Sequence, residues 1–193
     1  MGQTSEKTSR KPRSDSLRNR ELLLAAAHKV FSAGGPDASL EAVARTAGVG
    51  IGTLYRHYPT RESLFQAVYR HEVDQLVDLA VRLAAEAPPL EALRRWLHAV
   101  VGMVATKKGM VAALAPAAGS STELFAYSAA QLARSVGNLM ATAVAAGQIR
   151  DDIAADDVMR ALIGMCYMRD QPGWQDIVVR LVDVFVDGLR QQA

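Results

Sequence analysis

Apolar residues recur along most of this chain at the spacing of amphipathic helices, with positions i, i+3, i+4, i+7 and i+8 on one side. The first such stretch begins at Leu17 and stops before Gly34-Gly35-Pro36, because glycine accepts left-handed backbone angles and proline cannot continue a helix. Residues 1–16 are polar and lack this period, so they are predicted to form a disordered basic arm. The buried stripe of the first helix consists of Leu23, Ala26, Ala27, Val30 and Phe31.

Two short helices are predicted next, over about 40–47 and 51–57, joined by a tight turn at Gly48. Ser39 stands at the N-cap of the first, where a hydroxyl can accept a hydrogen bond from an unpaired backbone N–H. Two short helices joined in this way are typical of a helix-turn-helix, which places its second helix in the major groove of DNA. An ordinary helical hairpin with a glycine turn is the alternative. The residues predicted to fix the crossing of the two helices are Val43, Ala44, Gly48, Val49 and Leu54.

The rest of the chain is predicted to be helical as well, with breaks at proline and glycine. One long helix begins at residue 61 and another at Pro88-Pro89, and a short irregular helix is predicted over 109–120. No segment alternates apolar and polar residues as a half-buried strand would. The predicted fold is therefore all-α with about nine helices. The last three are predicted over about 122–146, 156–168 and 174–190.

The last predicted helix is apolar on more than one side. Its apolar residues cover an arc of roughly 220°, whereas a helix that buries one face needs only about 100°. One part of this arc is expected to pack on the protein's own body and the other against a second copy of the chain. A central helix buried within a monomer is the alternative. The residues predicted to form the dimer interface are Met159, Ile163, Val178, Val182, Phe185, Val186 and Leu189.

Composition narrows the class of protein. Half of the 193 residues are hydrophobic and the net charge is only +2, which excludes a wholly disordered chain. The single cysteine, Cys166, excludes an internal disulfide. No uncharged stretch reaches the ~18 residues of a membrane-spanning helix, and the polar N-terminus does not resemble a secretory signal. The protein is therefore expected in the cytoplasm, without contact to a membrane.

Positive charge is concentrated near the N-terminus. Residues 1–70 contain eleven Lys and Arg against six Asp and Glu, whereas residues 71–193 contain eleven against fourteen. A basic N-terminal third joined to a mildly acidic remainder is typical of a head that binds a polyanion.

The arrangements of residues that would carry catalysis are incomplete. The stretch His71-Glu72-Val73-Asp74-Gln75 ends in Gln where a zinc peptidase needs its second His. The glycines at 48, 50 and 52 follow no predicted strand and precede no lysine of a phosphate-binding loop. The chain is therefore predicted not to be an enzyme, and to hold no metal and no cofactor. A helical enzyme or scaffold with a non-functional helix-turn-helix is the alternative.

The run AVARTAGVGIGTLYRHYPTRESL, at residues 42–64, resembles the helix-turn-helix of the TetR family of bacterial transcriptional regulators nearly position for position. The resemblance covers about Leu17 to Tyr69. It implies a DNA-binding domain over 17–60, followed by a helical domain over 61–193 that binds a ligand and forms a homodimer. The ending MCYMRDQPGWQDIVVRLVDVFVDGLR is also similar to the last two helices of some members.

The resemblance also implies roles for individual residues of the head. Residues Thr53, Tyr55 and Arg56 would lie on the recognition helix, with Arg56 as the base reader through its planar guanidinium. The alternatives are that Tyr55 supports the helix from a half-buried position and that Arg45 pairs with Glu41. The residues assigned to phosphates are Tyr58, Arg61, Ser39 and Arg45. The residues of the basic arm would either enter a minor groove or add unspecific attraction to DNA, and they are Arg10, Lys11 and Arg13.

A small-molecule effector of unknown identity is implied by the resemblance too. The protein would be a repressor that this effector releases from a palindromic operator, because the two states of the protein would differ in affinity for the ligand. A constitutive DNA-binding protein without effector is the alternative. Methionine and aromatic side chains of the body suit an apolar pocket, although core packing would explain them equally. The candidate pocket residues are Trp96, Met103, Met110, Phe125, Tyr127, Met140 and Met165.

Overall fold

The computed structural model describes residues 11–33, 38–114, 122–168 and 171–191. The described residues form eight helices and no strand, which confirms the predicted all-α fold. None of the described helices has the length and apolar character needed to cross a membrane. The helices are α1 (Lys11–Ala33), α2 (Leu40–Ala47), α3 (Ile51–His57), α4 (Arg61–Glu86), α5 (Pro89–Leu114), α6 (Thr122–Ala145), α7 (Ala155–Tyr167) and α8 (Trp174–Gly188).

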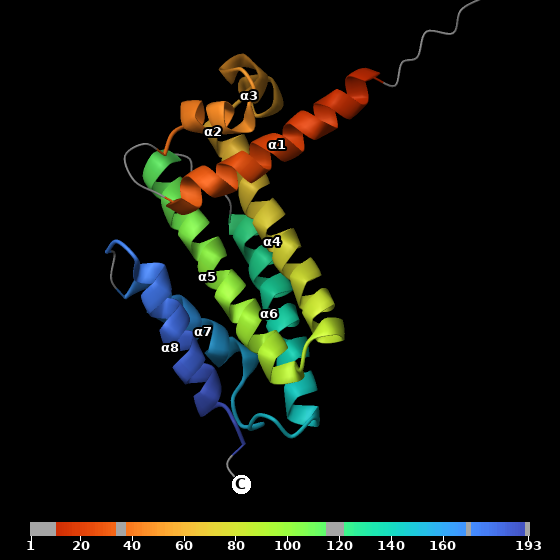
Figure 1. Cartoon of the computed structure of the whole chain (residues 1–193), viewed down its shortest axis with the longest axis vertical. Coiled ribbons are helices and arrows are strands. Elements are labelled where there is room, and N and C mark those ends of the chain that lie inside the picture. Colours follow the sequence, from red (N-terminus) through yellow and green to blue (C-terminus); the bar gives the residue numbers. More distant parts are fainter. Residues whose placement is uncertain (1–10, 34–37, 115–121, 169–170, 192–193) are drawn as a thin grey trace, which may run out of the picture.

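The helices form a small head on a longer body (Figure 1). In the head, α2 and α3 lie above α1, which crosses the upper ends of α4 and α5. In the body, α4, α5 and α6 run side by side, and α7 and α8 pack beyond α5. Helix α5 contacts α1, α4, α6, α7 and α8, so it is the central helix of the molecule. A single cluster of buried apolar residues runs through the described helices from Leu23 to Leu189.

Helix α1 begins at Lys11, six residues before the predicted start at Leu17. The prediction of a disordered arm is therefore wrong for residues 11–16, and residues 1–10 lie outside the described residues. The cause is that α1 is exposed at residues 15–18, where no apolar stripe marks the helix. Pro12 does not prevent this start, since proline is tolerated in the first helical turn.

Helix α5 continues to Leu114, so residues 109–114 do not form a separate helix as predicted. This is why eight helices are described instead of about nine. The remainder of that predicted helix, residues 115–120, lies outside the described residues.

Gly109 lies where α5 passes closest to the end of α1. A Cβ atom at this position would overlap the backbone carbonyl oxygen of Phe31. Glycine is therefore required by a contact between two helix backbones, and the helix continues through it because packing outweighs the low helix propensity of glycine. This contact joins the head to the body.

Candidate nucleic-acid interface

The turn between α2 and α3 is built by two residues with special backbone or capping roles. Ser39 Oγ accepts a hydrogen bond of 3.1 Å from the backbone N–H of Ala42, which caps the start of α2. Gly48 ends α2 with φ 69° and ψ 26°, a left-handed conformation that side-chain-bearing residues resist. The next residue, Val49, donates from its backbone N–H to the carbonyl of Ala44 over 3.0 Å. These contacts fix the direction in which α3 leaves the turn.

The inner faces of α2 and α3 hold the predicted core residues. Val43 and Leu54 are fully buried, Ala44 is almost fully buried, and Val49 packs on the core from a partly buried position. Because Leu54 occupies the inner face of the seven-residue α3, its neighbours are turned toward solvent.

The outer face of α3 presents the predicted recognition residues. Tyr55 is 42% exposed, Arg56 is exposed and Thr53 is half-buried. Neither Tyr55 nor Arg56 has a hydrogen bond or ion pair with another described residue, so both are available to an external partner. An exposed fraction of 42% is also compatible with the alternative in which Tyr55 supports the helix from a half-buried position, so its role stays a prediction.

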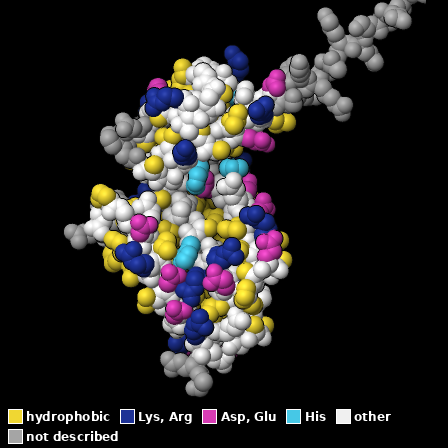
Figure 2. All heavy atoms as spheres, viewed as in Figure 1, with side chains coloured by type: hydrophobic (Ala, Val, Ile, Leu, Met, Phe, Trp, Pro, Cys, Tyr) yellow, Lys and Arg dark blue, Asp and Glu magenta, His cyan; other side chains and the backbone are white. Residues whose placement is uncertain are grey.

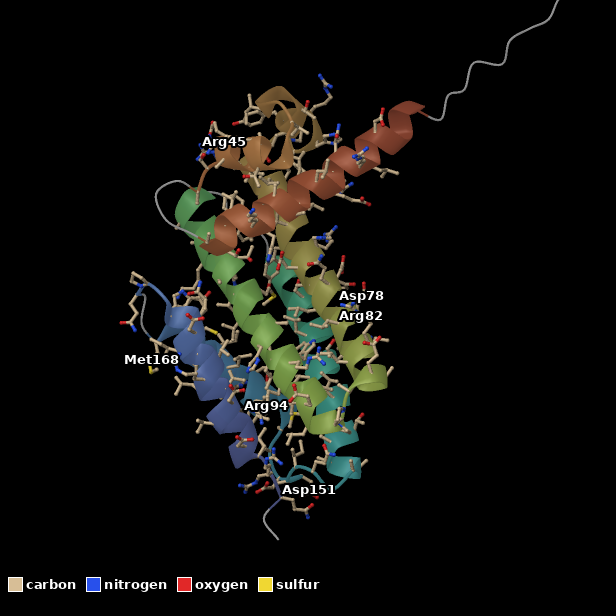
Figure 3. All side chains as sticks on the ribbon, in the orientation of Figure 1. Arg45, Asp78, Arg82, Arg94, Asp151 and Met168 are labelled. Carbon is tan, nitrogen blue, oxygen red and sulfur yellow. The ribbon has the colours of Figure 1, made fainter. Side chains whose placement is uncertain are left out.

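Arg45 is exposed on α2, at the left side of the head in Figure 3. It forms no ion pair with Glu41 or with any other described residue, so the predicted alternative of local pairing is not observed. Its guanidinium is available to a phosphate.

The start of α4 forms a second polar corner beside α3. Thr60 accepts from the Ser63 N–H over 3.0 Å, and Ser63 Oγ accepts from the Thr60 N–H over 3.1 Å. Arg61 is exposed in the first turn, at the positive end of the helix. An anion such as a phosphate would be favoured at this corner.

Tyr58 is not available for the phosphate contact predicted for it. The side chain is only 4% exposed and packs in the core between the head and α4. Burial raises the pKa of its phenol, and the charge of nearby Arg20 partly offsets this. The prediction failed because the residue follows α3 directly, where sequence position gives no information on whether the ring turns in or out.

The basic arm is described only in part. The backbones of Lys11 and Arg13 belong to the first turns of α1, whereas Arg10 lies outside the described residues. Their assignment to DNA remains a prediction.

A polar cluster that sequence reasoning missed joins the head to the body. His28 of α1 lies 2.7 Å from the carboxylate of Glu72 in α4, measured from Nδ1 to Oε1, and 3.2 Å from Oγ1 of Thr106 in α5. Glu72 is buried, and its hydrogen bond raises the pKa of His28 against the opposing effect of burial. Figure 2 shows histidine side chains where the upper and lower parts of the molecule meet. The available signal was that Glu72 falls on the buried side of α4, four residues before Leu76.

Next to this cluster, a cleft of about 900 Å³ opens between α1, α4 and α5. Its volume lies within the range of small-molecule sites. Of the candidate pocket residues, Met103 lines this cleft. Asp78 and Arg82, both exposed on α4, also line it (Figure 3).

The other candidate pocket residues have different surroundings. The buried indole of Trp96 donates to the carbonyl of Leu76 over 2.9 Å, which ties α5 to α4. Met110 and Met140 are buried in the core, and Met165 is partly buried against it. The ring of Tyr127 is 55% exposed and does not line this cleft, so its place in a pocket stays a prediction. The side chain of Phe125 lies outside the described residues.

Helix α8 has an inner and an outer apolar face. Val178, Val182, Val186 and Leu189 are all buried inside the protomer, so they cannot also touch a partner as predicted. The sequence periodicity showed that the apolar arc of this helix is too wide for a single packing surface. It did not show which part of the arc faces the inside of the protomer. The outer face carries Val184, which is 71% exposed, and Leu181. Of the other predicted interface residues, Met159, Ile163 and Phe185 are partly buried.

A charged cluster holds α8 against α5. Arg94 of α5 donates to the carboxylate of Asp183 over 2.9 Å and to that of Asp187 over 2.6 Å. His98 lies 2.9 Å from the same Asp183 oxygen. Arg94 lies between the two helices in Figure 3. The cluster fixes the rotation of α8 and therefore the direction of its outer face.

Comparisons with known proteins agree with this architecture. Residues 23–68 match the tetR family of bacterial regulatory proteins, and residues 88–191 match the C-terminal domain of SbtR-like transcriptional regulators. The TetR transcriptional regulator SCO0520 from Streptomyces coelicolor is 44% identical with a TM-score of 0.79, covering 90% of this chain and 99% of that one. The TetR transcription regulatory protein from Mycobacterium vanbaalenii is 33% identical with a TM-score of 0.73, covering 93% and 99%.

A curated relative matches over a shorter stretch of the chain. The HTH-type transcriptional regulator SAR0097 from Staphylococcus aureus is 36% identical over 73 residues, which is 37% of this chain. The match spans 38% of that relative's own length.

Proposed function

The chain belongs to the TetR family of bacterial transcriptional regulators, and we propose that it acts in the cytoplasm as a homodimeric repressor that a small molecule releases from a palindromic operator. The observation that carries this proposal is the outer face of α3, where the side chains of Tyr55 and Arg56 are exposed and have no hydrogen bond or ion pair with another described residue. The inner face of the same helix is buried. A planar guanidinium held in this way suits bidentate reading of a guanine edge in the major groove.

Phosphate contacts would hold the head on the duplex around α3. Arg45 at the end of α2 and Arg61 at the start of α4 are both exposed, and the capped N-terminus of α4 adds its partial positive charge. Ser39 is already used as the cap of α2, so any contact from it would be secondary.

Pairing of two chains would supply the second head. The outer face of α8, with Leu181 and Val184, is an apolar surface that one protomer leaves exposed. An isologous contact on this face would place two heads at a fixed separation, as a palindrome requires.

An effector would act through the junction between body and head. The cleft beside the His28–Glu72 pair is lined by α1, α4 and α5, and α4 itself begins in the head and ends in the body. A ligand that binds one arrangement of these helices more tightly would shift the population toward that arrangement, and with it the spacing of the heads. The size of the shift is limited by the difference in affinity between the two arrangements.

The proposal is tested by selecting bound duplexes from a random DNA pool with the full-length protein, then screening small molecules for release. We expect a palindromic consensus and at least one releasing compound. A consensus without any releasing compound would favour a constitutive DNA-binding protein. No enrichment over competitor DNA at moderate salt would contradict the proposed function.

A further inference from the structure

The cleft at the junction of head and body contains a buried carboxylate. Glu72 is only 5% exposed, yet it lines this cleft of about 900 Å³ between α1, α4 and α5. Its Oε1 lies 2.7 Å from Nδ1 of His28. The other oxygen, Oε2, has no hydrogen-bond partner among the described residues, and it is not sealed from solvent as a fully buried unpaired atom would be. Because a carboxylate can accept about four hydrogen bonds, Glu72 keeps acceptor capacity for a donor in the cleft.

His28 balances the charge of Glu72 only in part. A carboxylate accepts hydrogen bonds and cannot donate them, so Nδ1 of His28 carries the hydrogen of this contact. In its neutral form the imidazole supplies that hydrogen bond but no positive charge. The removal of a carboxylate from water is costly unless a positive charge accompanies it. A cation in the cleft would therefore be stabilised beside Glu72.

The rim of the cleft adds no net charge to this site. Asp78 and Arg82 are exposed side by side on α4 (Figure 3), and their opposite charges cancel in the sum. They are four residues apart, the spacing at which a carboxylate and a guanidinium can pair on a helix surface. The sign of the ligand is thus decided by Glu72, which attracts a cation and repels an anion.

Beside this carboxylate the cleft has apolar walls and free space. Leu79, Ala99 and Met103 line it, and the unbranched side chain of Met103 can adapt to the shape of a ligand. Gly102 also lines it, and a Cβ atom added there would meet nothing within 4 Å. The cleft can therefore hold an apolar group next to a charged one.

We propose that this cleft binds a protonated amine with an apolar substituent, whose ammonium group donates to Oε2 of Glu72. An ammonium group brings both the hydrogen bonds and the positive charge that Glu72 can accept. One carboxylate balances one cation, so the amine competes with protonated His28 and weakens the contact between α1 and α4. As a statement about regulation this rests on the proposed function, in which such an amine would be the effector.

The site is tested without DNA by three probes that share one alkyl chain and differ in charge. Dissociation constants of hexylammonium, hexanol and hexanoate for the full-length protein are measured by ligand-observed NMR at constant ionic strength near neutral pH. We expect hexylammonium to bind most tightly and hexanoate least tightly. The proposal is overturned if hexanol binds as tightly as hexylammonium, or if hexanoate binds best.

Glu72→Gln keeps the size of the side chain and removes its charge. It should weaken hexylammonium binding by about tenfold or more and leave hexanol binding nearly unchanged, because a charge-assisted hydrogen bond is lost. A variant that failed to fold would lose both probes, so the difference between probes separates the role of the charge from a structural role. The matched control is Glu86→Gln, an exposed carboxylate of the same helix outside the cleft, which should bind as the wild type does. An unchanged preference for hexylammonium in Glu72→Gln would overturn the proposal.

Two further variants test the place and the competition. Gly102→Leu extends a side chain into the open space of the cleft and should weaken all three probes alike. Probe binding as in the wild type would show that the amine binds elsewhere. His28→Ala removes the competing donor, so it should bind hexylammonium at least as tightly as the wild type. A loss as large as that of Glu72→Gln would reject the competition.

The regulatory part is tested with operator DNA. At equal ionic strength, hexylammonium should weaken operator binding by the wild type more than by Glu72→Gln. Equal operator binding with and without bound probe would reject the amine as effector, whereas the probes without DNA would still decide whether the cleft binds it. A protein that binds no DNA would contradict the proposed function only.

Discussion

In the head, α2 and α3 have only eight and seven residues, so the role of a side chain follows from its position in the helix. In the body, the same apolar residue types lie on either the inner or the outer face of a helix. Helix α3 buries Leu54 and has no room for a second apolar face, so Tyr55 and Arg56 face solvent. Helix α8 is twice as long and apolar on two sides, with Val182 inside and Val184 outside.

The difference has a physical origin. The head is fixed by backbone chemistry that can be recognised in a sequence, such as the N-cap at Ser39 and the left-handed Gly48. The structure of the body is determined by the packing of its long helices, which depends on residues far apart in the chain. Substitutions at single positions in the two regions can therefore separate the two cases.

The two faces of α8 should respond in opposite ways to a charge. Val182→Glu would place a carboxylate in the core without a partner, and should destabilise the fold by several kcal/mol. Val184→Glu should leave the protomer folded and convert the proposed dimer into monomers. Urea unfolding and sedimentation measure the two effects. A monodisperse dimer of Val184→Glu would place the interface on another surface.

The backbone contact between head and body should be sensitive to a single methyl group. Gly109→Ala would press against the Phe31 carbonyl, which cannot move aside as a side chain would, and should cost about 1–3 kcal/mol. The control is Gly102→Ala in the same helix, where the added methyl meets open space and should stabilise by roughly 0.5–1 kcal/mol. Thermal unfolding of both variants checks this, and equal melting temperatures would mean that α1 can shift freely on α5.

The recognition face should determine specificity without affecting stability. Arg56→Ala or Tyr55→Ala should weaken operator binding by roughly 1–3 kcal/mol and leave the melting temperature unchanged, because both side chains are exposed. Titration against operator and random DNA measures the effect. An equal loss on both duplexes would show that the residue contacts phosphate instead of a base.

The His28–Glu72 pair should give stability a modest dependence on pH. Its hydrogen bond raises the pKa of His28 above the ordinary 6.5, so its contribution is complete below pH 6.5 and is lost as pH rises through the folded-state pKa. The effect should be below about 1 kcal/mol because the imidazole is half-exposed. Urea midpoints from pH 5 to 9 for the wild type and His28→Asn measure it, and identical profiles would reject a role for this pair.

The sequence was sufficient to predict the positions of residues whose role depends on near neighbours in the chain. The two short helices, the turn at Gly48 and the inward Val43 and Leu54 were all predicted, since each depends on contacts within about ten residues. The family follows from the same stretch, because its spacing is shared by many regulators.

Residues whose role depends on distant contacts could not be placed. Residue 109 was predicted to begin a separate short helix, yet Gly109 lies within α5 where another helix passes. Glu72 was part of an incomplete zinc motif, yet it pairs with a histidine 44 residues earlier. Tyr58, directly after α3, and Val182, within α8, could each face the core or the solvent, and only the packing of the neighbouring helices decides which.

The contact between Gly109 and the Phe31 carbonyl has a mechanical consequence. The two helix backbones meet here without a side chain between them, so no change of rotamer can absorb a small displacement. A shift of α5 at this point must therefore push α1 directly, with little loss along the way. A movement of α5 would therefore be passed directly to α1 and the rest of the head. The absence of a side chain at this position makes the connection between body and head stiff.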